Sequence, residues 1–235
     1  MVKRSEPDVP TVYFRGTPRA LDCLVGIPHR EVGPVPRISV DAPNVRLQSI
    51  FAFDVGGKAS RLQLSMSENT PPGNYKASVE LGGKAFPAEI RVEPYVHLAL
   101  SPRQLIVAAH AGEKQHLELT LANSGNVPCE IGSTYAFGLY DVHGAERGIG
   151  AAFRQRENTG EKRWERLLEE LASGHAGTVR VQLEQGHGSI APGDVRTLRL
   201  DLHFPAKLEA GHTYSGTLAM ENLRYYVKVR AVAEK

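Results

Sequence analysis

Nine histidines are the residues of this chain whose side chains could most readily bind a metal or transfer a proton. They are His29, His97, His110, His116, His143, His175, His187, His203 and His212. No His-Glu-x-x-His or Cys-x-x-Cys sequence gives the ligand spacing of a zinc site. His203 and His212 flank one turn-rich stretch, so they could approach each other. We predict no metal site, no cofactor, and a fold that does not need a metal.

Sequence motifs for covalent catalysis are missing as well. There is no Gly-x-Ser-x-Gly sequence, and Gly148-Ile149-Gly150 is too short to indicate a phosphate-binding loop. Cys23 and Cys129 are too few for a zinc site and lie far apart in the chain, so we expect both to be unpaired. These absences favour a non-enzymatic protein, with an enzyme whose site lies at a domain junction as an alternative.

The last strand-like run carries the most informative surface pattern. Its apolar residues at 223, 225, 227 and 229 alternate with Arg224, Tyr226, Lys228 and Arg230, here called the basic stripe. A period of two places the stripe on the outer face of a strand. Such a row suits an acidic partner through charge, or a carbohydrate through stacking on the tyrosine. A solubilising face and charged protection of an edge strand remain alternatives.

The segment from about 157 to 174 predicts a helix inserted between two β-rich stretches. Asn158 or Thr159 can cap it, and Gly174 ends it. Its apolar side carries Trp164 next to the basic Arg163, and we add both residues to the candidate binding set. The alternative is that this side packs against the neighbouring sheet.

Exposed aromatic residues would indicate a carbohydrate-binding module instead. The candidates for such a platform are Trp164, Tyr226, and the pair Tyr135 and Tyr140. Sugar rings can stack on aromatic side chains only where several of these side chains are exposed together.

The elements that position these residues follow one pattern that occurs twice. Alternating apolar residues run through 195–231 and through 60–92, and both runs predict three strands in an antiparallel meander. The two copies match at offsets of 202 − 64 = 138 and then 218 − 79 = 229 − 90 = 139. We predict that six matched residues are buried: Leu64, Leu202, Val79, Leu218, Ile90 and Val229.

Earlier in the chain, 45–55 predicts one long strand. The strand is indicated by a shared parity of its apolar residues Val45, Leu47, Phe51, Phe53 and Val55. Shorter strands are expected at 11–15 and 20–25, before the turn-rich stretch 28–36.

The composition fits a globular all-β protein of two domains. The chain has 235 residues with 41% hydrophobic content, 23 glycines and 15 prolines. A net charge of +2 gives no reason to expect nucleic acid as a partner, and no segment has the ~20 apolar residues of a membrane helix. As written, the chain indicates a cytoplasmic protein; removal of a signal peptide would make it periplasmic or extracellular.

The second half resembles bacterial immunoglobulin-like domains of the PapD-like and NEW3-like groups. The resemblance rests on the run Leu98 to Leu105, on Gly112, on Leu117 to Pro128 with its Asn-Ser-Gly-Asn-Val-Pro turn, and on Ile190-Ala-Pro-Gly-Asp. It covers about 95–132 and 188–231, and by internal repetition 45–93. It implies a β-sandwich and leaves the function open, because this fold serves many roles.

Together these patterns predict an all-β protein with two tandem immunoglobulin-like antiparallel β-sandwiches. The domains are expected at 1–94 and 95–235, with one short helix inserted in the second. The expected function is protein binding in a structural, assembly or chaperone-like accessory role. The partner is expected to be another protein, with an acidic surface as one possibility and a carbohydrate as the alternative.

Overall fold

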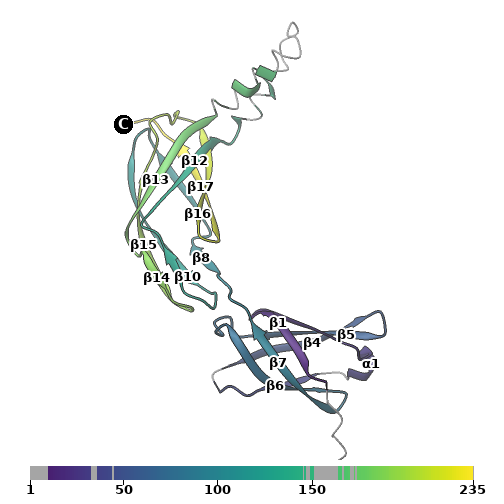
Figure 1. Cartoon of the computed structure of the whole chain (residues 1–235). Coiled ribbons are helices and arrows are strands. Elements are labelled where there is room, and N and C mark those ends of the chain that lie inside the picture. Colours follow the sequence, from purple (N-terminus) through teal and green to yellow (C-terminus); the bar gives the residue numbers. More distant parts are fainter. Residues whose placement is uncertain are drawn as a thin grey trace, which may run out of the picture. The chain divides into compact units, whose positions relative to one another are not determined.

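A computed structural model describes residues 10–32, 36–43, 45–144, 146, 149–150, 164–165, 167–169, 172 and 174–234. The regular secondary structure of these residues is almost entirely β-strand, and they form two compact units (Figure 1). Unit 1 comprises residues up to Val96 together with Ser124–Pro128, and unit 2 comprises His97–Asn123 and the chain from Cys129 onward.

Unit 1 is one seven-stranded sheet folded around a core. Its strands are β1 (Val12–Thr17), β2 (Ala20–Val25), β3 (Arg37–Val40), β4 (Leu47–Val55), β5 (Ala59–Met66), β6 (Gly73–Leu81) and β7 (Lys84–Val92), with the short helix α1 (His29–Val32) after β2. The strand order is β3-β6-β7-β1-β2-β5-β4. Because β1 pairs in parallel with β7 and antiparallel with β2, it joins the two layers of the sandwich. The small helix α1 was not predicted from the sequence.

Unit 2 repeats this plan with more strands. They are β8 (Leu98–Ser101), β9 (Gln104–Ala109), β10 (Lys114–Asn123), β11 (Cys129–Ile131), β12 (Thr134–Asp141), β13 (His175–Gln185), β14 (Gly188–Ile190), β15 (Val195–His203), β16 (Thr213–Met220) and β17 (Leu223–Ala231). The main sheet has the order β8-β10-β15-β13-β12-β16-β17-β9, and β11 pairs with β14. The first two strands of the unit go to different layers: β8 pairs with β10, and β9 pairs in parallel with the last strand, β17. This is an immunoglobulin-like arrangement. The chain is therefore an all-β protein of two tandem immunoglobulin-like sandwiches.

The internal repeat is structural. In unit 1, β5 pairs with β2, and β7 pairs with the parallel strand β1; in unit 2, β15 pairs with β10, and β17 pairs with the parallel strand β9. The six matched residues are all 2% exposed or less, so their predicted burial is confirmed. Each copy thus supplies the same three strands to its own core.

The prediction that these three strands form a meander is wrong in both units. β15 lies between β10 and β13, whereas β16 lies between β12 and β17, and β5 is likewise not paired with β6. The residues from Phe204 to His212 are long enough to carry the chain from one layer to the other, whereas adjacent hairpin strands need only a short turn.

The parity shared by the apolar residues of 45–55 does not define one buried face of β4. The register shifts between Leu47 and Ser49, and this bulge reverses the parity of the residues that follow. Ile50 and Ala52 therefore pack against the core, while Phe51, Phe53 and Val55 are 56%, 48% and 43% exposed.

A loop of the second half completes unit 1. Asn126, which follows β10, is 3% exposed. Its side-chain amide donates hydrogen bonds to the carbonyl oxygens of Thr70 and Glu93, each at 3.0 Å, and its Oδ1 accepts one from the Tyr95 N–H at 2.6 Å. This asparagine satisfies three backbone groups that no strand ladder pairs.

The inserted segment lies between β12 and β13. Within 157–174, the described residues 164–165, 167–169 and 172 are helical, and the rest of the predicted helix, including Arg163, lies outside the described residues. Trp164 and Leu168 are 66% and 62% exposed, so neither is buried by packing on a sheet. The backbone N–H of Asp141 donates to the carbonyl of Gly174 at 2.8 Å, which closes the base of the insertion.

Replacement of residues 157–173 by a short Gly/Ser linker should leave unit 2 folded. The strands on either side are already joined at the base, where Tyr140 pairs with His175. Thermal unfolding followed by circular dichroism should show a cooperative transition like that of the full chain. Loss of that transition would mean that the insertion is part of the core.

Candidate functional site

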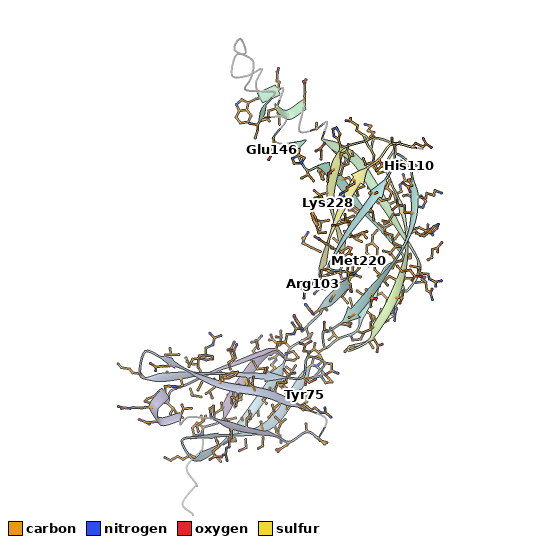
Figure 2. All side chains as sticks on the ribbon, turned by 180° about the vertical axis from the view of Figure 1, so that it is seen from behind. Tyr75, Arg103, His110, Glu146, Met220 and Lys228 are labelled. Carbon is orange, nitrogen blue, oxygen red and sulfur yellow. The ribbon has the colours of Figure 1, made fainter. Side chains whose placement is uncertain are left out.

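The basic stripe lies on β17, on the outer face of unit 2. Arg224, Tyr226 and Arg230 are exposed and Lys228 is half-buried, while the alternate residues point into the core. Figure 2 labels Lys228 on this strand. Because β17 is paired on both sides, with β16 and with β9, it is an inner strand. The cations are therefore not protecting a free edge, and that alternative is wrong.

The residues paired with the stripe leave its charge unbalanced. Thr213, Ser215, Thr217 and Ala219 of β16 and Gln104, Ile106 and Ala108 of β9 stand directly beside it. None of these neighbours is a carboxylate, and those on β16 are short. The stripe and these seven neighbours are called the β17 face. It carries three positive charges and no negative one.

Tyr140 extends this surface by one strand. It pairs with Ser215, so it lies across β16 from Lys228, and it is 58% exposed. Its ring contacts the ring of His175 with centroids 4.9 Å apart. Tyr140 and Tyr135 do not form the aromatic platform predicted for them, because residues five apart on a strand face opposite sides.

Tyr135 has a structural role instead. Its hydroxyl oxygen accepts a hydrogen bond from the backbone N–H of Gly132 at 2.7 Å. Burial raises the pKa of this hydroxyl above its ordinary value.

Beneath the stripe lies Tyr225, which is 2% exposed. Its hydroxyl is buried and has no hydrogen-bond partner among the described residues. The same burial raises the pKa of this hydroxyl. An unpaired buried hydroxyl destabilises the folded state, because it loses its bond to water and gains nothing in return.

Tyr225→Phe should therefore leave the free energy of unfolding unchanged or raise it. The matched control is Tyr214→Phe, because the buried Tyr214 hydroxyl accepts a hydrogen bond from the Glu209 N–H at 3.2 Å. The control should lower the free energy of unfolding by about 0.5–1.5 kcal/mol. Urea unfolding measures both; a larger loss for Tyr225→Phe than for Tyr214→Phe would contradict the assignment.

Three strands bring together one group that could hold a cation. His116 of β10, Glu184 of β13 and Asp201 of β15 place their donor atoms within 4.8 Å of one another, on the described part of the chain. The His116 Nδ1 and the Asp201 Oδ1 are 2.5 Å apart and share a hydrogen bond. One imidazole nitrogen and two carboxylate oxygens suit a divalent ion such as Zn²⁺. No local pattern in the sequence indicates this group, because its members are 68 and 17 residues apart (184 − 116 and 201 − 184).

Dialysis against a chelator should leave the melting temperature unchanged. The group lies on an outer face, where the His116 side chain is 75% exposed, and Asp201 already has a hydrogen-bond partner without a metal. Differential scanning calorimetry before and after dialysis tests this. A large drop in melting temperature would show that the fold depends on a bound ion.

A second carboxylate–imidazole pair closes the end of the sheet. The Asp141 side chain is 3% exposed and accepts hydrogen bonds from the His143 N–H at 2.8 Å and from the His212 Nδ1 at 2.7 Å. The pair ties the end of β12 to the turn before β16. His203 lines a cavity of about 630 Å³ together with Tyr135, Arg180 and Gln182. The hydrogen-bond partner of His212 is Asp141 and not His203, which was predicted to approach it.

The remaining candidates lie on the inserted segment. Trp164 is exposed there, and Arg163 lies outside the described residues. The two buried cysteines, Cys23 and Cys129, are free, as predicted. Among the described residues, no helical stretch has the length and apolar character needed to cross a bilayer.

Comparison with known proteins identifies no family for this chain. No protein-family model and no curated protein matches the chain. Among solved structures, domains 4 and 5 of the S-layer protein SbsC match at 14% identity and a TM-score of 0.27, over 84% of this chain and 77% of that one. The adhesin InvE of Yersinia pseudotuberculosis matches at 14% and 0.26, over 93% and 58%. A titin I-band fragment matches at 10% and 0.33, over 96% and 63%.

These similarities are low. The chain spans about three fifths of the adhesin and of the titin fragment. The assignment to the immunoglobulin-like fold therefore rests on the strand pairing of each unit.

Proposed function

We propose that this chain is a non-enzymatic protein-binding module with a structural, assembly or chaperone-like accessory role, and that the β17 face binds an acidic surface of another protein. The observation that carries the proposal is the unbalanced charge of an inner strand. Three cations and one tyrosine share one face, and no carboxylate is paired beside them.

The fold itself does not require this charge. The equivalent outward residues of β7 in unit 1 are Ala85, Pro87, Glu89 and Arg91, whose charges sum to zero. Two strands with the same place in the same fold thus differ by three charges on their outer faces. A difference that packing does not explain supports a role in binding.

The geometry of the face favours an extended acidic partner. Successive stripe residues are spaced by about 6.6–6.8 Å along the strand. The short side chains of β16 leave the long cationic side chains uncovered on that side. A row of carboxylates at a similar spacing could approach all three cations at once. Trp164 and Arg163 of the inserted segment are proposed as further contacts, and kinship with the PapD-like and NEW3-like groups belongs to the same proposal.

A carbohydrate ligand is the second candidate. It is favoured by Tyr140 and Tyr226, which are 58% and 43% exposed on strands separated only by β16. Stacking on these rings would need no charge, so salt would affect it little. We favour the protein partner because three of the four stripe residues are cations.

Reversal of two stripe charges tests the proposal. Arg224→Glu with Lys228→Glu should slow association with immobilised poly-glutamate about tenfold at roughly 20 mM salt, because long-range attraction speeds encounter. The difference should shrink at roughly 150 mM salt, where the screening length is about 8 Å. Biolayer interferometry measures both association rates.

The matched control is Lys84→Glu with Arg91→Glu on β7. Both residues are exposed, and both double variants change the net charge from +2 to 2 − 4 = −2. The control should retain the wild-type rate. Equal slowing by both variants would assign the effect to net charge and sink the proposed site. Binding of a neutral glucan that Tyr226→Ala abolishes would favour the carbohydrate instead.

A further inference from the structure

The edge strand of unit 1 lacks the usual protection against pairing. β4 ends the seven-stranded sheet and pairs only with β5 among the described residues. Its nine residues, Leu47–Val55, contain no lysine or proline, and Asp54 is its single charge. Exposed edges usually carry charges, proline or a bulge that turns them away. The bulge of β4 lies near its start, and pairing with β5 is regular from Ile50 to Val55.

The outer face beside this edge is apolar. Phe51, Phe53 and Val55 point outward and are about half exposed. On the same face, Leu24 of β2 is 67% exposed and lies across Arg61 from Phe53. The charge of Arg61 is balanced by Asp22, with Nη2 and Oδ2 2.9 Å apart. The exposed row adds nothing to the core of unit 1, which Ile50 and Ala52 already contact.

Unit 2 shows that this fold does not have to leave such an edge open. In unit 1, β4 lies beside the first repeated strand, β5, and in unit 2 the strand at this place is β13, beside β15. Strand β13 pairs with β15 on one side and with β12 on the other. In unit 1, β4 and β3 end the sheet without pairing to each other. At this place in the sheet, only unit 1 has an unpaired edge, and that edge carries the exposed apolar row.

We propose that β4 pairs with β4 of a second copy of this chain, in an antiparallel arrangement about a two-fold axis. This proposal is independent of the β17 face. Two identical antiparallel strands form a closed, self-complementary contact, since each copy presents the same edge. With Phe53 on the axis, Phe51 faces Val55 of the second copy, and both residues lie in the regular stretch of β4.

The charges of the strand fit this arrangement. With the same axis, Asp54 faces Ala52 of the second copy, so no like charges oppose each other across the pair. A strand with one charge in nine residues cannot attract a strongly charged partner through charge. A second copy of the same strand is equally low in charge and equally apolar, so it is a suitable partner. Residues directly opposite each other point to the same side, so the two apolar rows join into one surface.

Pairing of the two edges brings apolar side chains into contact across the strands. Side chains directly opposite each other in an antiparallel pair have Cβ atoms about 4.5–5.5 Å apart. Phe53 therefore contacts Phe53 of the second copy, and Phe51 contacts Val55. Leu24 lies two strands from the edge and extends the joined apolar surface.

Sedimentation velocity of the full chain from about 1 to about 200 µM tests the proposal. The mass should rise from 25.7 kDa toward 2 × 25.7 = 51.4 kDa. Phe51→Lys with Phe53→Lys should raise the dissociation constant at least tenfold. The control is Val195→Lys with Val232→Lys, two residues of unit 2 that are 66% and 45% exposed, and it should dimerise like the wild type. Circular dichroism confirms that each variant is folded.

Cross-linking locates the axis. Phe53→Cys should form a covalent dimer under mild oxidation, whereas Val195→Cys should not. A wild-type mass of 25.7 kDa over the whole range overturns the proposal, and so does equal weakening by both lysine variants. A wild-type monomer that nonetheless binds a synthetic peptide of residues 47–55 would also exclude the second copy, and would point to an extended segment of another protein.

Discussion

The parallel pairing between the start and the end of each unit determines how both sandwiches are built. β1 pairs with β7 in unit 1, and β9 pairs with β17 in unit 2. In unit 2 this contact makes β17 an inner strand, paired along both edges, so its outer residues form a continuous surface. Without β9, the same four outward residues would stand on an edge and would have a protective use. The meaning of the basic stripe therefore depends on a strand more than a hundred residues earlier (226 − 104 = 122).

The two units differ at the side of the sheet away from the parallel pair. In unit 2, β12 and β13 pair from Thr134 to Tyr140, which closes the sheet on the side away from β9. Close approach of neighbouring strands accompanies this closure: a Cβ on Gly216 would stand 2.5 Å from the carbonyl oxygen of Gly138. Unit 1 has only the short β3 in the corresponding region, and its sheet stays open there. The difference in surface between the units thus follows from which strands are long enough to pair.

Alternation in the sequence predicted those strands whose parity is uninterrupted. It placed Leu64, Leu202, Ile90 and Val229 in the core because a period of two allows only one face to be buried. It failed at β4, where one extra residue after Leu47 reverses every later side chain. It also could not predict that β15 and β16 separate into different layers, or that His116, Glu184 and Asp201 converge. Those features depend on pairing between distant strands, and no local pattern records such pairing.

The parallel terminal strands have a mechanical consequence. When the two ends of unit 1 are pulled apart, β1 and β7 are drawn past each other along their length, from the Val12–Ala88 pair to the Gly16–Val92 pair. The backbone hydrogen bonds between them are then loaded together, in shear, whereas a hairpin opened from its end breaks its bonds one after another. β9 and β17 have the same geometry in unit 2. Tension along the chain therefore meets, in each unit, a set of bonds that must fail at once.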